Sequence, residues 1–276
     1  MPTMPRHLLR GFERISVPLL EATNRLPGFR RILHFVSGWL NAAWIYAATA
    51  RRWNITGLET VQTLDAPGGI ILVSNHRSFF DMFVISTILK FRTHLLTRVA
   101  YPVRSSFFYT NPLGVLLNYM VAGASMWPPV FRDDRRRTLN PVGMRQLAHT
   151  LGKGAVVGMH PEGTRSHHSD PCEFLPRKPG LGQLLAVCAP DVVVLPVFIY
   201  GLSSDIVLEI WRRRDLPSLP IKVNFGPPLR VADLQAQAQK DPLATTELVF
   251  EHVQRLAEFD NTYQRTVGND GHNLLL

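Results

Sequence analysis

Two short segments of the chain carry side chains that can do acid–base chemistry. The first, residues 75–81, reads NHRSFFD and directly follows an apolar run. Asp81 can fold back from the first turn of a helix and hold one ring nitrogen of His76, which leaves the other nitrogen as a base. The sequence has no Gly-x-Ser-x-Gly nucleophile elbow, so this base is expected to activate a hydroxyl of the substrate. The alternative is that Asp81 only caps a helix and His76 is an ordinary loop histidine.

The second segment, residues 160–166, reads HPEGTRS and also follows an apolar run. A proline, a glycine and hydroxyl residues around Glu162 and Arg165 predict a tight turn whose backbone N–H groups can cradle an oxyanion or a phosphate. The planar guanidinium of Arg165 suits two phosphate oxygens at once. The alternative here is an ordinary polar turn with a glutamate–arginine ion pair.

The apolar runs around these segments predict alternating strands and helices. Strands are expected at 70–74, 155–159, 192–199 and 221–225, and helices at 79–89, 180–188 and 245–259. Ser78 is expected to cap the first helix, with Asp81 completing a capping box. The alternation indicates an α/β fold with a mixed, largely parallel sheet flanked by helices. Such sheets bind ligands at the carboxyl ends of their strands, where both segments lie.

The N-terminal fifth of the chain differs from the rest. Residues 1–52 hold eight arginines against Glu13 and Glu21, a net +6 of the +9 carried by the whole chain. The longest uncharged run, residues 32–50, has 19 residues and as a helix would be about 28 Å long, close to the hydrocarbon thickness of a bilayer. We expect a basic amphipathic helix and an apolar helix that lie on, dip into or span a membrane. The alternative is a soluble core helix behind a solvated arm.

The composition excludes several classes of protein. A hydrophobic fraction of 46% and a charged fraction of 18% exclude a disordered chain, and a single long apolar run excludes a polytopic transporter. Two cysteines cannot make a disulfide framework, which favours a reducing compartment. We expect three parts: membrane-associating helices at 1–52, an α/β domain at 53–265 and a frayed tail at 266–276.

Taken together, the two segments resemble the glycerolipid acyltransferase family, whose best-known members are bacterial 1-acyl-glycerol-3-phosphate acyltransferases. The first family block, Asn-His-x4-Asp, is matched by Asn75, His76 and Asp81, and the third, Pro-Glu-Gly-Thr-Arg-Ser, by residues 161–166. The second block matches at 130–132, ending in Arg132, and the fourth at 194–197. All four blocks follow the family order, although His160 stands where the family usually has an aromatic residue.

The resemblance implies a reaction and a role for each matched residue. His76 would be the general base and Asp81 its orienting partner, and the free hydroxyl of a lysophosphatidate-like glycerolipid would attack an acyl thioester without an acyl-enzyme. The implied substrate-binding residues are Arg132, Glu162, Gly163, Thr164 and Arg165. The two arginines would bind the acceptor phosphate, and Glu162 would organise the turn. Replacing His76 or Asp81 with alanine is expected to abolish transfer and leave the fold intact.

The same resemblance implies that the reaction belongs to phospholipid synthesis, and it implies the partners. No metal or redox cofactor is implied, and acyl-CoA or acyl carrier protein would be the co-substrate. The partners would be a lysophospholipid acceptor and an anionic membrane surface, and not nucleic acid. The protein is expected on the cytoplasmic face of the cell membrane as a peripheral, monotopic or single-span protein.

Two alternatives to this function remain. The acceptor could be glycerol-3-phosphate or a lyso-aminolipid, because the same base would serve. The chain could also be a basic nucleic-acid- or membrane-binding protein without activity, since a pI near 10.1 favours polyanions. No recognised nucleic-acid-binding motif is evident, however, and an inactive scaffold would be expected to lack His76 or Asp81.

Overall fold

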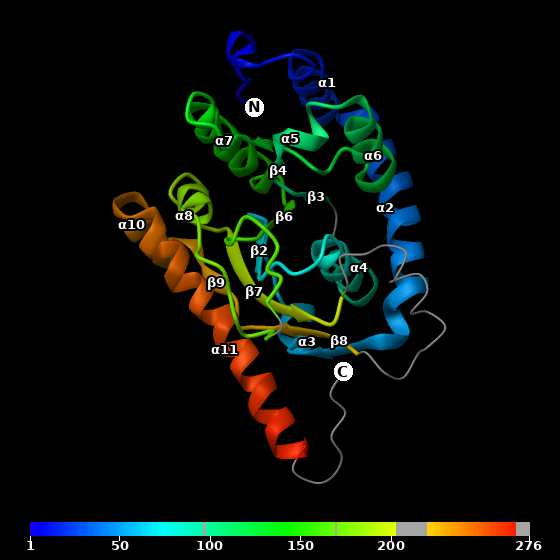
Figure 1. Cartoon of the computed structure of the whole chain (residues 1–276), viewed down its shortest axis with the longest axis vertical. Helices are drawn as coiled ribbons and strands as arrows, with labels where there is room; N and C mark the ends of the chain where they lie inside the picture. Colours follow the sequence, from blue (N-terminus) through cyan, green and yellow to red (C-terminus); the bar gives the residue numbers. More distant parts are fainter. Residues whose placement is uncertain (96–97, 169, 203–219, 269–276) are drawn as a thin grey trace.

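A mixed, mostly parallel sheet forms the centre of the molecule (Figure 1). The computed structural model describes residues 1–95, 98–168, 170–202 and 220–268. Within these residues the main sheet has the strand order β1-β8-β7-β2-β6-β3, and β9 pairs with β7. The strands are β1 (Trp53–Thr56), β2 (Ile70–Ser74), β3 (Val99–Ala100), β6 (Val156–Met159), β7 (Val193–Tyr200), β8 (Ile221–Phe225) and β9 (Leu229–Arg230). Only the pairings of β7 with β8 and β9 are antiparallel, so the predicted fold class is confirmed.

Helices cover both faces of the sheet because its central strands are apolar on both sides. Ile71 and Val73 of β2 pack toward α7 (Asn140–Leu151), α8 (Gly180–Leu185), α10 (Val231–Lys240) and α11 (Pro242–Gly268). Ile70 and Leu72, which point the other way, pack toward α2 (Pro27–Thr49), α3 (Leu58–Gln62) and α4 (Asp81–Arg92). This double coverage explains why β2 reads as a continuous apolar run.

The N-terminal helices pack against the rest of the chain. A short 3-10 turn (Arg6–Leu8) precedes α1 (Glu13–Arg25), and another (Ala50–Arg52) follows α2. Val17 and Leu20 of α1 are buried in a core with Tyr109 and Trp127. Arg136, just before a third 3-10 turn (Arg137–Leu139), forms an ion pair with Glu13. Among the described residues, no helix has both the length and the apolar character needed to cross a membrane.

A small two-stranded sheet joins β4 (Val103–Arg104) to β5 (Pro129–Val130), with α5 (Ser105–Phe108) and α6 (Pro112–Ala122) between them. The predicted strands and helices exist, but several bounds differ. The first helix begins at Asp81 instead of residue 79, and α8 ends at Leu185 instead of 188. The last helix begins at Pro242 and includes residues 266–268 of the predicted tail, whose residues 269–276 lie outside the described residues.

Candidate active site

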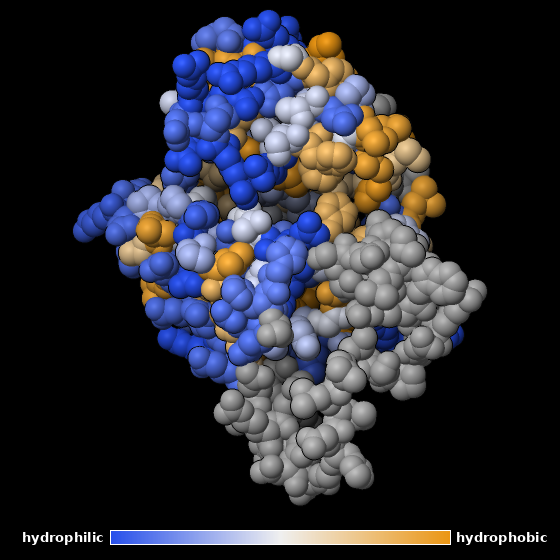
Figure 2. Space-filling model, viewed as in Figure 1, coloured by the Kyte–Doolittle hydropathy of each residue, from blue (hydrophilic) through white to orange (hydrophobic). Residues whose placement is uncertain are grey.

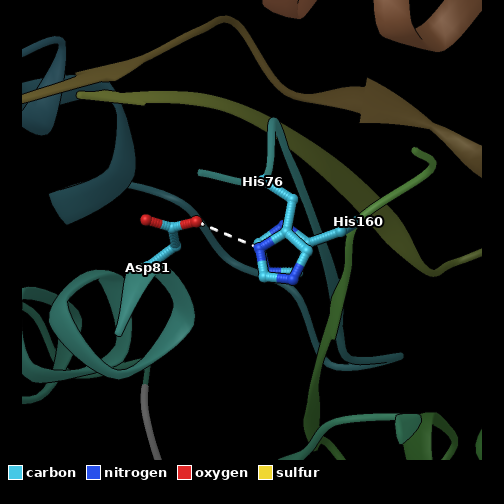
Figure 3. Close-up of side chains that lie close together, drawn as sticks. All are labelled: His76, Asp81 and His160. Atoms are coloured by element: carbon cyan, nitrogen blue, oxygen red, sulfur yellow. Dashed lines mark hydrogen bonds and ion pairs between the residues drawn. The ribbon is translucent and has the colours of Figure 1, made fainter. Parts of the chain in front are cut away.

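His76 and Asp81 meet where β2 ends and α4 begins. Nδ1 of His76 lies 3.1 Å from Oδ2 of Asp81 (Figure 3). The carboxylate is 1% exposed, whereas the imidazole is 20% exposed and can be reached from solvent. An ionised carboxylate can only accept a hydrogen bond, so the proton of the neutral imidazole is on Nδ1. Nε2 then has a free lone pair, as a general base requires.

Backbone contacts hold the loop between β2 and α4 in place. The side-chain amide of Asn75 donates to the carbonyl of Ile199 at 2.8 Å and accepts from the N–H of Ile199 at 2.9 Å, which fixes the loop to β7. Oδ2 of Asp81 accepts the N–H groups of Arg77 and Ser78 at 2.7 and 2.8 Å. Asp81 therefore completes its half of the predicted capping box. The other half differs, because Phe80 is the N-cap and Ser78 Oγ accepts from the N–H of Phe80.

The turn at 160–166 is bonded directly to the backbone of His76. The N–H of His76 donates to Oε1 of Glu162 at 2.8 Å, and the N–H of Ser166 donates to the carbonyl of His76 at 2.7 Å. Oε2 of Glu162 accepts the N–H of Leu175, also at 2.8 Å. Glu162 is 1% exposed and each of its oxygens already accepts a backbone bond. Glu162 therefore joins the two segments through the backbone of His76.

Arginines lie in and beside this turn. Arg132 donates to the carbonyl of Gly163, whose φ of +69° is a conformation that favours glycine. Thr164 is exposed and Arg165 partly buried. Burial lowers the pKa of Arg132, and so does the charge of Arg104, which pairing of β4 with β5 brings near it. Sequence reasoning missed Arg104, because it lies outside the family blocks.

Burial sets the protonation states of the pair. Burial, together with the positive charge of Arg165, lowers the pKa of His76 to about 4. Burial raises the pKa of Asp81 to about 6, opposed by the nearby histidine at position 160 and by the N–H groups that the carboxylate accepts. At pH 7 the imidazole is therefore neutral and the carboxylate ionised, which is the state that can take a proton from a hydroxyl.

His160 is a site residue to which the sequence analysis gave no role. Its ring stacks on that of His76, with centroids 3.9 Å apart and planes 8° apart (Figure 3). The available signal was its place directly after a strand, where the family usually has an aromatic residue.

Within the described residues, one group of potential metal ligands lies close together: His76, Asp81 and His160, with ligating atoms within 4.8 Å of one another. Ligands of one ion converge on it along the lone pairs of their donor atoms. Stacked, nearly parallel rings direct their lone pairs along parallel planes, so this arrangement is poorly suited to a metal ion.

Comparisons with known proteins place the chain in a family. The model of a family described as Acyltransferase matches residues 52–200, more than half of the chain, including both motif segments. Among solved structures, the chain is similar to the 1-acyl-sn-glycerophosphate (LPA) acyltransferase PlsC from Thermotoga maritima. The identity is 19%, the coverage 91% of this chain and 85% of that chain, and the TM-score 0.44. A comparison with curated proteins gives no match. The family match shows that this chain belongs to the Acyltransferase family.

Proposed function

We propose that the protein transfers a fatty acyl group from an acyl thioester to the free hydroxyl of a lysophosphatidate-like glycerolipid. The observation that carries the proposal is the His76–Asp81 pair, bonded through the backbone of His76 to the arginine-flanked turn at 160–166. A base for a hydroxyl and cations for a phosphate thus occupy one site. PlsC, with which the chain shares the similarity reported above, is a 1-acyl-sn-glycerophosphate acyltransferase by name.

In the proposed reaction, Nε2 of His76 takes the proton of the acceptor hydroxyl as that oxygen attacks the thioester carbonyl. The tetrahedral intermediate collapses, the C–S bond breaks, and the thiolate leaves and is protonated by the imidazolium. Asp81 keeps Nδ1 protonated and stabilises the positive charge that the ring acquires. The enzyme supplies no nucleophile of its own, so no acyl-enzyme forms. Acyl-CoA or acyl carrier protein would serve as donor.

The proposal is tested with purified protein in detergent, supplied with a panel of acceptors and with both donor types. The panel contains lysophosphatidate, glycerol-3-phosphate and a lyso-aminolipid. Acyl transfer to lysophosphatidate, measured by labelled product, is the expected result. Preferred transfer to another acceptor of the panel would change the proposed acceptor and leave the proposed reaction unchanged. Turnover of no acceptor with either donor would overturn the proposal.

Arg165 provides a prediction about acceptor binding. Its guanidinium lies near the imidazole of His76, and we propose that it binds the acceptor phosphate together with Arg132. A hydrogen bond to a charged group contributes about 1.5–3 kcal/mol, so Arg165→Ala should raise the KM for the acceptor about 10- to 100-fold and change kcat much less. Arg255→Ala, on an exposed part of α11, is the matched control. An unchanged acceptor KM in Arg165→Ala would exclude the phosphate contact.

We also propose that the protein works at a membrane surface, because its acceptor is an amphiphile. Exposed apolar side chains gather on three helices: Ile15 and Leu19 of α1, Phe35, Trp39, Leu40 and Trp44 of α2, and Leu113, Leu116 and Met120 of α6. Figure 2 shows apolar residues over α6 and the neighbouring part of α2. A bound enzyme would not have to extract the acceptor, whose chain burial is worth about 0.8 kcal/mol per CH₂.

Vesicle binding tests the membrane proposal. Phe35 and Leu40 are each 66% exposed, so the double variant Phe35→Glu/Leu40→Glu should lower binding to phosphatidylglycerol vesicles about tenfold or more in co-sedimentation. Leu243→Glu changes a 41% exposed side chain of α11 and should bind like the wild type. Equal binding by the double variant and the wild type would remove α2 from the contact surface.

A further inference from the structure

The stacked pair of imidazoles arises from neighbouring strand ends. β2 and β6 are adjacent and parallel, with Val73 beside Met159, so the next residues are Ser74 and His160. His76 follows β2 by two residues and His160 follows β6 directly. Sheet register thus places one ring on the face of the other, 3.9 Å apart and nearly parallel.

His160 is itself held by the end of β2. Its Nδ1 lies 3.2 Å from the carbonyl oxygen of Ser74 and 3.1 Å from Oγ of Ser74. A carbonyl only accepts, so Nδ1 of His160 carries a proton. Because Ser74 is buried within the strand, His160 presents its ring to His76 from a fixed support.

We propose that His160 is a positioning residue whose ring face fixes the imidazole of His76 in the plane that serves both Asp81 and the acceptor hydroxyl. The inference rests on the proposed function. The final torsion of a histidine side chain is soft, and the bond to Asp81 restrains only one nitrogen of the ring. The second restraint comes from the flat contact, which resists tilting of Nε2 away from the reacting oxygen.

The same contact suits the ring after it has taken the proton. A neutral aromatic face stabilises the imidazolium, whereas a second positive charge would repel it. Burial and the neighbouring His76 lower the pKa of His160 to about 3, so His160 stays neutral. Electrostatic interactions link the pair to Asp81 of α4 and to Arg165 of the turn after β6. The role requires the flat face, and we expect an aromatic ring without the bond to Ser74 to serve it.

Two variants of similar volume distinguish a role of the flat ring face of His160 from a role as a side chain that only fills space. His160→Phe keeps an aromatic face and His160→Leu does not, and both lose the bond to Ser74. We expect His160→Leu to lower kcat about 10- to 100-fold, with acceptor and donor KM within about twofold, and His160→Phe to stay within about threefold of wild type. His252→Ala on α11 is the control for loss of a remote histidine. Equal losses in the Phe and Leu variants, or no loss in either, would overturn the inference.

A measurement without turnover keeps this inference separate from the proposed function. Nitrogen-15 NMR of the imidazoles should show His76 as a single Nδ1–H tautomer in the wild type and in His160→Phe. In His160→Leu, Asp81 still holds the Nδ1 proton, but the ring that has lost its flat support should show broadened His76 signals and faster exchange of that proton with solvent. Signals as sharp as in the wild type, with unchanged proton exchange, in the Leu variant would contradict the positioning role. Failure of the wild type to transfer acyl groups would instead overturn the proposed function and leave this spectrum unaffected.

Discussion

Replacement of His76 with alanine is expected to lower kcat for acyl transfer by about 10²- to 10⁴-fold, the contribution of a positioned general base. The variant should fold, because the hydrogen bonds of His76 to the turn at 160–166 are made by its backbone. Its N–H donates to Glu162 and its carbonyl accepts from Ser166, and alanine keeps both groups. The result is checked by acyl transfer at saturating substrate.

Thermal unfolding provides the control for this variant. His76→Ala and wild type should unfold within a few degrees of each other, and the remote variant His252→Ala should keep wild-type activity. A well-folded His76→Ala protein that retains more than about a tenth of wild-type kcat would exclude general-base catalysis by His76.

Two substitutions of Asp81 should separate its chemical role from its structural role. Asp81→Asn keeps an oxygen that can accept the N–H groups of Arg77 and Ser78, but it removes the charge that stabilises the imidazolium. We expect its kcat to fall about 10²- to 10⁴-fold with little change in stability. Asp81→Ala should lose a similar amount of activity and also stability, at about 1–3 kcal/mol for each buried N–H left without a partner.

The alanine result would correct the expectation from the sequence that this substitution leaves the fold intact. Denaturant unfolding of the two variants side by side provides the measurement. A near wild-type kcat in Asp81→Asn would exclude a catalytic role of the carboxylate. Wild-type stability in Asp81→Ala would exclude its structural role.

The main strands could be predicted from the sequence because they are continuous apolar runs. The run 70–74 is buried on both sides and became β2 with the predicted bounds, and 221–225 became β8. Strands β3, β4 and β5 have two residues each, too few to show any period. The predicted start of α4 is two residues early. Ser78 Oγ accepts the N–H of Phe80 in the turn that precedes the helix.

The contacts within the candidate site could be predicted only where its parts lie close in sequence. His76 and Asp81 are five residues apart, so one helix start is enough to bring them together. The bonds of Glu162 to two backbone N–H groups and the stacking of His160 depend on which strands are neighbours. The residues of the two motifs do not show that β2 pairs with β6. The resemblance gave Glu162 an organising role without identifying its partners.

The central claim, direct attack of an acceptor hydroxyl activated by His76, is tested by thiol release from a labelled acyl thioester. The wild-type protein receives lysophosphatidate or an otherwise identical molecule whose free hydroxyl is replaced by hydrogen. Thiol should be released, and label transferred, only when the hydroxyl is present. Stoichiometric thiol release with label retained on the protein, in the presence of the deoxy acceptor, would contradict the account.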